Sequence, residues 1–251
     1  MRTDRLNEME QYIVRNTTAS LEELTQVFSI SMNTVRRDVQ MLLQRGLIRK
    51  VYGGVEVIQQ TQPLPMSVRA ATCKEEKQLI GKLAATLIPD HSSVFLDSGT
   101  TTCQVLPYLA EKKGITVVTH SLTALCEASR YPNLRVINLG GVFNASTSSY
   151  IGISTVEALA KLNVQTVLIA TTGVTLEQGL TNTTYMEADV KRYITAKSTN
   201  IILMADHTKF DRAAVLSFLP FERLSAVVTD EKPAPEYVSF MEKHNIRLLC
   251  P

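Results

Sequence analysis

Apolar residues recur at helical spacing in the first two segments of the chain. In residues 4–15 they fall three and four positions apart, so they share one face of a helix; they are Leu6, Met9 and Ile13. A second helix is expected over residues 21–28, because Ser20 is followed three positions later by Glu23, the pattern of a capping box. The pattern predicts two short helices at the N-terminus.

A third helix is expected after Ser31, whose hydroxyl can cap it. Its apolar positions recur at i, i+4 and i+7 and share one face: Val35, Val39 and Leu42. The opposite face is polar: Asn33, Arg37, Gln40 and Gln44, with Arg36 on its flank. Only three residues separate this helix from the second, which predicts a helix-turn-helix. Arginine and asparagine match the hydrogen-bonding edges of guanine and adenine, although a solvated amphipathic helix is the plain alternative.

The segment behind this helix predicts a basic wing. Gly46 can end the helix, and residues 47–52 and 55–57 read as two strands around the Gly53-Gly54 turn. Over residues 31–52, five Lys and Arg residues and one Asp give a local charge of +4. Such cations neutralise phosphates. The residues predicted to bind DNA are Ser31, Asn33, Thr34, Arg36, Arg37, Gln40, Arg49, Lys50 and Tyr52.

Length and charge divide the chain in two. Its 251 residues exceed one average domain. Residues 1–54 hold eight basic and six acidic residues, whereas the remainder holds 18 of each, so the net charge of +2 belongs to the N-terminal part. Pro63 and Pro65 interrupt a polar stretch. We expect a DNA-binding domain over 1–58, a linker over 59–72 and a second domain over 73–251.

In the second domain, helical stretches alternate with short apolar runs. Such runs suit strands that are covered on both faces, so we expect an α/β fold with a mostly parallel sheet and helices on either side. The predicted strands are 94–96, 115–118, 134–137, 166–170, 201–204, 226–228 and 246–249, and the predicted helices are 75–87, 102–110, 122–129, 155–162, 186–197 and 235–243.

Polar residues follow several of these strands, at the edge where parallel sheets bind small ligands. Asp97–Thr102 follows a strand and opens a helix, so backbone N–H groups and threonine hydroxyls can face an anion. A capped turn without a ligand is an equally good interpretation of this motif alone. Residues 119–121, 140–141 and 171–173 end three more strands with polar or glycine residues.

Charged residues extend this candidate site. Asp97, Asp206 and Asp230 each end an apolar run, and a carboxylate accepts hydrogen bonds from sugar hydroxyls. Lys209 would supply a cation, although a local turn with a surface charge is the plain alternative for Asp206 and Lys209.

Two further positions are open to both interpretations. Glu187 and Lys191 lie four positions apart on one helical face, where an exposed ion pair is the plain alternative. His120 alone would more often be a packed core histidine than a ligand contact.

The remaining residue types limit the classes of function. The four cysteines and four histidines are scattered, so we expect reduced thiols, no metal and no cofactor. No apolar run approaches the roughly 20 residues of a membrane span, and the polar N-terminus does not resemble a signal peptide. We expect a cytoplasmic protein that does not bind membranes.

The motifs together resemble the DeoR family of bacterial sugar-metabolism repressors over nearly the whole chain. The segments on which this resemblance depends are Ser31–Asp38, Asp97–Thr101, Val118–Leu122, Leu139–Gly141 and Asp206–Phe210. Two residues depart from the family's pattern: His120 replaces an asparagine, and Tyr52 replaces a histidine. The resemblance implies a sensor domain similar in fold to ribose-5-phosphate isomerase and coenzyme A transferases. It also implies a phosphorylated sugar-like effector, bound by Asp97, Ser98, Gly99, Thr100, Thr101, Thr102, His120, Ser121, Gly140, Gly141, Gly173, Glu187, Lys191, Asp206 and Lys209.

Two other functions compete with a ligand-controlled repressor. One is a residual sugar-phosphate isomerase that uses Asp97, Glu187 or Lys209 as acid or base, although a shared fold does not transfer catalysis. The other is a DNA-coating protein without sequence preference. A repressor with one helix-turn-helix per chain makes few base contacts, so we expect a homo-oligomer, a dimer or tetramer, on operator DNA with repeated half-sites. We expect the linker at Pro63 and Pro65 to transmit the effect of ligand binding from the second domain to the DNA-binding domain.

Overall fold

The chain folds into two compact units, Met1–Thr61 and Gln62–Pro251. A computed structural model describes residues 2–16, 18–44, 48–57 and 66–251. Gly46, the predicted helix end, and the Pro63 and Pro65 joint lie outside the described residues.

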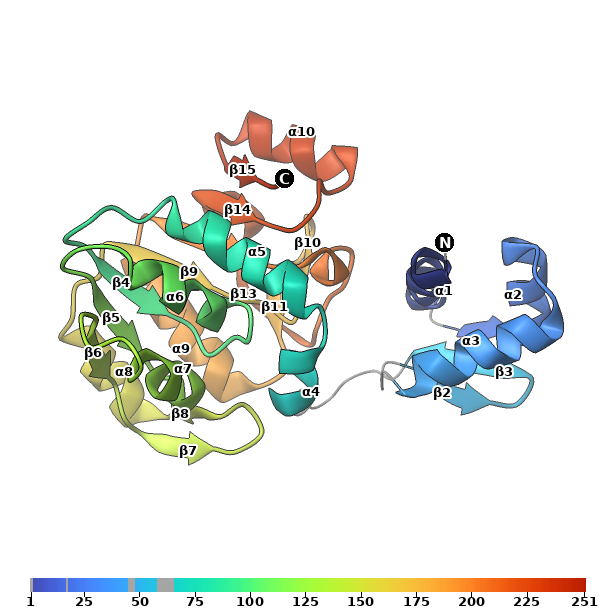
Figure 1. The fold of residues 1–251 in the computed structure, drawn as a ribbon, viewed down its shortest axis with the longest axis horizontal. Helices are drawn as coiled ribbons and strands as arrows, with labels where there is room; N and C mark the ends of the chain where they lie inside the picture. Colours follow the sequence, from blue (N-terminus) through green and yellow to red (C-terminus); the bar gives the residue numbers. More distant parts are fainter. Residues whose placement is uncertain (1, 17, 45–47, 58–65) are drawn as a thin grey trace. The chain divides into compact units, whose positions relative to one another are not determined.

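The N-terminal unit consists of three helices and a small antiparallel sheet (Figure 1). The three helices and the wing lie where the sequence predicts them. A short additional strand, β1, pairs with β3, so that the strand order is β1-β3-β2. Its three residues are too few to show a period. The elements are α1 (Arg2–Asn16), β1 (Thr18–Ser20), α2 (Leu21–Phe28), α3 (Met32–Gln44), β2 (Ile48–Val51) and β3 (Gly54–Val57).

Local signals in the sequence position these helices. Ser20 Oγ accepts a hydrogen bond from the Glu23 backbone N–H at 3.0 Å, and the Glu23 carboxylate accepts one from the Ser20 N–H at 3.2 Å. The predicted capping box is therefore present. The predicted apolar stripes form one buried core, which contains Leu6, Met9, Ile13, Leu24, Val35, Val39 and Leu42.

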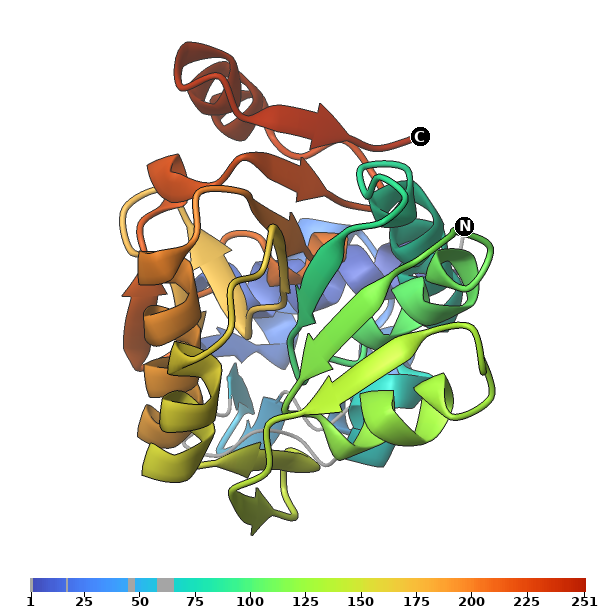
Figure 2. The same cartoon turned by 90° about the vertical axis from the view of Figure 1, so that its left-hand side faces the viewer.

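The C-terminal unit is built on a seven-stranded sheet in which every neighbouring pair is parallel. The arrows of β4, β5 and β6 point the same way in Figure 2. The strand order is β15-β14-β12-β9-β4-β5-β6. The strands are β4 (Ser93–Leu96), β5 (Thr116–Thr119), β6 (Arg135–Asn138), β9 (Thr166–Ile169), β12 (Ile201–Met204), β14 (Ala226–Val228) and β15 (Arg247–Leu249).

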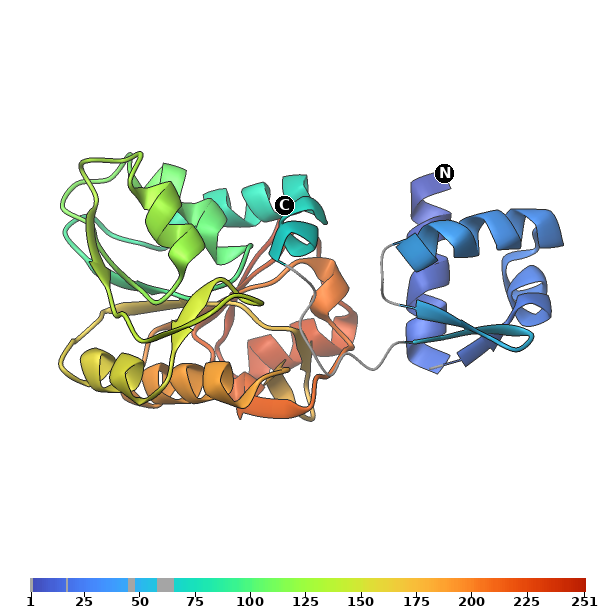
Figure 3. The same cartoon turned by 90° about the horizontal axis from the view of Figure 1, so that it is seen from below.

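Helices cover both faces of this sheet, which confirms the predicted architecture (Figure 3). Successive strand residues point to opposite faces. Val94 and Leu96 accordingly join the apolar cluster of α5, α6 and α7, whereas Phe95 joins that of α8, α9 and α10. The helices are α4 (Met66–Ala71), α5 (Lys74–Ala85), α6 (Leu106–Leu109), α7 (Leu122–Ala128), α8 (Ile153–Ala160), α9 (Tyr185–Lys197) and α10 (Pro235–Lys243), with short 3-10 turns η1 (Thr102–Val105), η2 (His207–Lys209) and η3 (Phe221–Arg223).

Two antiparallel additions were not predicted. A hairpin joins β7 to β8, and a three-stranded sheet has the order β10-β11-β13. Their strands are only three or four residues long and mix polar with apolar residues, so they show no usable period. They are β7 (Val142–Asn144), β8 (Ser149–Ile151), β10 (Gly173–Thr175), β11 (Gly179–Asn182) and β13 (Leu216–Leu219).

The strand order creates a switch point between β4 and β9. From β4 the chain continues to β5 and β6 on one side, and then returns to place β9 on the other side. Ligands of open parallel sheets bind beyond the carboxyl ends of the strands at such a point. A ligand-binding site is therefore expected at the segments that follow β4 and β9.

Candidate functional site

The α3 helix presents four residues of the predicted polar face to solvent, and the side chain of the fifth, Gln44, is not described. Asn33, Arg36, Arg37 and Gln40 are exposed, whereas Val35, Val39 and Leu42 are buried. Ser31 Oγ accepts the Thr34 N–H at 3.3 Å, as expected of a helix cap. The side chains that could reach base edges are accessible.

The one acidic residue of this helix does not face solvent. Asp38 is buried and accepts a hydrogen bond from Arg5 Nε on α1 at 2.9 Å, and Arg5 Nη2 forms an ion pair with the same carboxylate oxygen at 2.8 Å. This pair ties α1 to α3 and removes the negative charge from the surface of α3. Arg36 and Arg37 therefore dominate the charge of its exposed face.

The wing also carries exposed side chains. Lys50 is exposed, and Tyr52 at the turn is fully exposed. Arg49 lies opposite Glu56 on the paired strand and forms an ion pair with it. The Arg49 side chain remains 68% exposed, so it can still reach a phosphate. DNA contacts by these residues stay a prediction.

In the C-terminal unit, the loop after β4 is buried. Asp97, Ser98, Gly99, Thr100, Thr101 and Thr102 are all buried. Thr102 Oγ1 donates to the carbonyls of Asp97 and Gly99 at 2.8 and 2.9 Å, and so closes the loop on itself. A Cβ on Gly99 would lie 2.5 Å from the Ala170 Cβ. The glycine is thus required because the loops after β4 and β9 touch.

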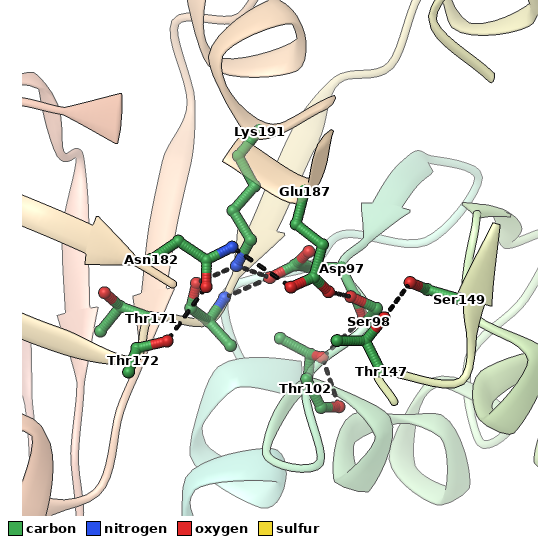
Figure 4. Close-up of polar contacts among 12 residues, drawn as sticks. Asp97, Ser98, Thr102, Thr147, Ser149, Thr171, Thr172, Asn182, Glu187 and Lys191 are labelled. Atoms are coloured by element: carbon green, nitrogen blue, oxygen red, sulfur yellow. Dashed lines mark hydrogen bonds and ion pairs between the residues drawn. The ribbon is translucent and has the colours of Figure 1, made fainter. Parts of the chain in front are cut away.

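Asp97 lies at the centre of a buried charged group (Figure 4). Its Oδ2 accepts hydrogen bonds from Lys191 Nζ at 2.7 Å and from the Ala170 N–H at 2.9 Å. Lys191 Nζ also donates to the Ala170 carbonyl at 2.6 Å. Lys191 on α9 therefore holds together the loops that follow β4 and β9.

The environment of Asp97 keeps it ionised. Burial alone would raise the pKa of Asp97, but the Lys191 ammonium and His120 outweigh burial and hold that pKa below its ordinary value. His120 Nε2 lies 3.4 Å from Asp97 Oδ1, and Nδ1 lies 2.9 Å from the Tyr150 carbonyl. The His120 ring also stacks on Phe95. The histidine is buried and hydrogen-bonded, as the plain alternative expects.

Glu187 forms a second buried centre beside Asp97 (Figure 4). Its carboxylate accepts hydrogen bonds from Ser98 Oγ at 3.2 Å, Thr184 Oγ1 at 3.1 Å and Asn182 Nδ2 at 3.4 Å. The alternative of an exposed Glu187–Lys191 ion pair is wrong, because both side chains are buried and each has other partners. Carboxylates here favour hydroxyl donors over an anion.

Asp206 and Lys209 follow β12 and form a local turn. Asp206 is buried, caps η2 and accepts the Thr208 N–H at 3.2 Å. Burial would raise the pKa of Asp206, but Lys209 and the Thr208 hydrogen bond outweigh it, so the pKa is lowered. Within this turn, His207 Nδ1 lies 2.6 Å from Asp230 Oδ2, and that hydrogen bond raises the pKa of His207.

Other predicted residues have evident structural roles. Ser121 caps α7 by accepting the Ala124 N–H at 3.1 Å. Gly140 and Gly141 both have positive φ, and the Gly140 carbonyl accepts Thr155 Oγ1 at 2.8 Å. Gly173 begins β10, where a Cβ would lie 2.4 Å from the Arg212 carbonyl. None of these contacts joins the group around Asp97 and Glu187.

Two basic residues near this group were missed. Lys77 on α5 is buried, and its environment includes Asp206 and Lys209. The sequence could have indicated that Lys77 is buried, because it occupies the same helical face as the apolar residues Ile80 and Ala84. Arg69 lies on α4, and burial lowers the pKa of its guanidinium. The nearby carboxylates of Glu187 and Asp97 act in the opposite direction but do not outweigh burial. Arg69 lies in the predicted linker, where no signal marked it.

The described residues contain no group of three His, Cys, Asp or Glu side chains that could hold a metal ion. Within the same residues, no helix combines the length and apolar character needed to cross a membrane. A surface hollow of about 640 Å³ lies between the β10–β11 turn, β13 and α10, and no predicted effector residue lines it.

Comparison with known proteins matches both units. A model described as "DeoR-like helix-turn-helix domain" matches residues 5–61, and one described as "DeoR C terminal sensor domain" matches residues 72–231. The chain is 39% identical to the HTH-type transcriptional regulator IolR of Bacillus subtilis (strain 168), over 98% of each protein. It is 29% identical to the glycerol-3-phosphate regulon repressor of Escherichia coli (strain K12), over 99% of each. Ribose 5-phosphate isomerase A from Methanocaldococcus jannaschii is 14% identical, with a TM-score of 0.42 over 55% of each chain.

Proposed function

Because the chain belongs to the DeoR family, we propose that it represses a carbohydrate or polyol catabolic operon under the control of a phosphorylated sugar-like intermediate. The N-terminal unit binds the operator, and the C-terminal unit binds the effector. A repressor acts on the chromosome, so the proposal implies a cytoplasmic protein. We also propose a homo-oligomer, a dimer or tetramer, since two N-terminal units bound to repeated half-sites make twice as many base contacts as one.

The exposed polar face of α3 supports operator binding. Asn33 and Arg37 are accessible on a helix whose opposite face is buried, which is the arrangement that direct readout in the major groove needs. Lys50 and Arg49 on the wing would contact phosphates.

The buried charges at the switch point carry the effector half of the proposal. Moving an ion from water into a protein interior costs several kcal/mol after relaxation. Asp97, Glu187 and Lys191 are nevertheless all buried together beyond the ends of β4 and β9. Perturbed ionisable groups gathered in this way are typical of functional sites.

The distribution of charge suggests how the effector is oriented. The three residues that donate hydrogen bonds to Glu187 are neutral, so its side of the site suits polyol hydroxyls; they are Ser98, Asn182 and Thr184. Lys209 and the Ser98–Thr102 loop suit the phosphate. The motifs Lys50–Val55 and Gly179–Asn182 also resemble the repressor of myo-inositol catabolism. A phosphorylated keto acid of inositol breakdown is therefore the first effector to test.

The isomerase alternative receives less support. A general base works best when its pKa is close to the working pH. The pKa of Asp97 is instead held low by Lys191 and His120. A turnover assay on phosphorylated sugars tests this alternative, and turnover that disappears in Glu187→Gln would establish it.

Operator recognition is tested first with DNA selected from a random duplex pool. We expect Arg37→Ala to lose about 1–3 kcal/mol of preference for the selected duplex over a scrambled one, because one base contact is removed. Arg135→Ala is the control, since Arg135 is exposed on β6 and its loss changes the net charge equally. Equal competition by random DNA against wild type would favour a coating protein and contradict the proposal.

Effector control is tested by a thermal-shift screen of phosphorylated metabolites, because selective binding to the native state raises the melting temperature. With the compound so identified, Thr100→Val and Lys209→Ala should bind the selected duplex normally yet fail to respond to the compound. Lys232→Ala, an exposed lysine of the same unit, is the control. Normal responses in both variants would refute the assigned site.

A further inference from the structure

The β7–β8 hairpin and the residue that begins α8 expose three large apolar side chains. In β7, Val142 is 67% exposed and Phe143 is 47% exposed, and Ile153 at the start of α8 is 79% exposed. Val142 lies beside the turn that leads to Ile153, because a Cβ on Gly152 would lie 3.9 Å from Val142 Cγ2. Single exposed apolar residues are ordinary, whereas a group of them is typical of an interaction surface.

One backbone side of this hairpin is already paired. The Tyr150 N–H donates to the His120 carbonyl at 2.7 Å, and the Leu122 N–H donates to the Ser148 carbonyl at 2.9 Å. These bonds fix β8 to the segment that leads into α7. β7 is the outer strand of the hairpin, and in the described part of the chain it pairs only with β8 (Figure 1).

The register shows which backbone groups of β7 point outward. Both backbone groups of Tyr150 face His120, since the Tyr150 carbonyl also lies 2.9 Å from His120 Nδ1. Phe143 lies opposite Tyr150 on β7. In an antiparallel ladder such a pair exchanges no hydrogen bonds, so the Phe143 N–H and C=O point away from β8. We call this outward side of β7 the free edge.

The sequence around the free edge lacks the residues that prevent strand pairing. Exposed edge strands are commonly protected by charged side chains or proline. Residues 136–156 contain no charged residue, no histidine and no proline, although charged residues make up 20% of the chain. The residues that flank β7, Gly141 and Ala145, are small and allow another backbone to approach. An extended strand can therefore add to this edge.

A second copy of this chain fits the free edge. Two copies related by a twofold axis present the same patch to each other, so any charge on the patch would face its own kind. The uncharged hairpin avoids this repulsion. Identical strands across such an axis also run antiparallel. When Phe143 lies opposite Phe143 of the second copy, the two residues can exchange both of their outward N–H···O=C hydrogen bonds.

We propose that the free edge of β7 pairs with the same edge of a second copy, so that the two hairpins form one four-stranded antiparallel sheet. Phe143 lies at the centre of this interface, where aromatic residues are enriched and charged residues are depleted. The pairing rests on the proposed function, which needs at least two copies on repeated half-sites. It specifies the surface that joins them.

Opposite charges introduced at Phe143 test the pairing in the full chain. Phe143→Lys and Phe143→Glu each place like charges opposite each other when a variant pairs with itself, and both remove the aromatic contact. In sedimentation equilibrium, we expect each variant alone to raise the dissociation constant about tenfold or more. An equimolar mixture of the two should recover most of this loss, because lysine then faces glutamate. Val215→Lys and Val215→Glu are the matched controls, since Val215 is 72% exposed outside the hairpin.

Hydrogen exchange of the wild type provides a second arm that needs no variant. Amides buried in an interface exchange slowly only while the copies are associated. We expect residues 141–145 to exchange about tenfold more slowly above the dissociation constant than below it. This arm decides the question even if a Phe143 variant does not fold.

Three results would overturn the pairing. A wild type that stays monomeric refutes the pairing and the proposed homo-oligomer together. Normal association of both Phe143 variants, without concentration-dependent protection of 141–145, refutes the pairing but leaves a homo-oligomer that is joined by another surface. Weakened variants that do not recover on mixing show that Phe143 does not face its own copy.

Discussion

The Lys191–Asp97 pair allows a quantitative test of the buried charges. Lys191→Met removes the ammonium but keeps most of the side-chain volume. At the observed Nζ–Oδ2 separation of 2.7 Å, Coulomb's law with an effective dielectric constant of about 20 gives a gross attraction of ~6 kcal/mol. Desolvation of both ions offsets part of this. We expect the variant to lose about 3–5 kcal/mol of unfolding free energy at pH 7, because Asp97 stays buried without its cation.

The pH dependence distinguishes this cause from a simple packing defect. In wild type the pKa of Asp97 is lower in the folded state than its ordinary 3.8. Its contribution to stability is therefore present above about pH 4 and is lost as the pH falls further. In Lys191→Met, burial instead raises the pKa of Asp97. Protonation of Asp97 then removes the unpaired buried charge as the pH falls from 7 toward 4. The difference in unfolding free energy between the variant and wild type therefore becomes smaller.

Urea unfolding followed by circular dichroism at several pH values measures both effects. Lys161→Met is the control, since Lys161 is an exposed lysine on the neighbouring segment after α8. The double variant Asp97→Asn/Lys191→Met completes a double-mutant cycle, and we expect it to be more stable than the sum of the single losses allows. Additive losses, or a deficit that stays constant with pH, would refute the assigned pairing.

Two further predictions concern local contacts. Ser20→Ala should lower the unfolding free energy of the N-terminal unit by about 1 kcal/mol, because the Glu23 N–H loses its acceptor. Thermal melts of the full chain measure this loss, with exposed Ser29→Ala as the control. An unchanged melting temperature in Ser20→Ala would contradict the cap. The pKa of His207 is raised by Asp230, so its contribution to stability is complete below about pH 6.5 and is lost as the pH rises through the folded-state pKa. His207→Asn should remove that part of the decline between pH 6.5 and 9, and identical urea curves for variant and wild type would contradict the pairing.

The elements that the sequence predicts are those whose signals are local. The cap at Ser20 and the apolar stripe of α3 each lie within one or two helical turns, and both are confirmed. The parallel strands were predictable because runs such as Ile201–Met204 are wholly apolar, as a sheet covered on both faces requires. The short antiparallel strands had no such signal, because pairing with distant segments, rather than their own composition, stabilises them.

The candidate site was only partly predictable for a related reason. The sequence placed Asp97 at one edge of the sheet, because the carboxyl ends of parallel strands meet there, whereas Glu187 and Lys191 became candidates only through the family resemblance. It did not indicate that Lys191 pairs with Asp97 instead of Glu187, since that contact spans 94 positions along the chain. Arg69 lay in a segment that had been assigned to the linker, and only the packed structure brings it close to Glu187.

The two units use charge in opposite ways. Arg36, Arg37 and Lys50 are exposed, so salt screens their attraction for DNA. Lys77 and Lys191 are buried, where added salt screens much less. Operator affinity should therefore fall steeply with salt while effector affinity changes little.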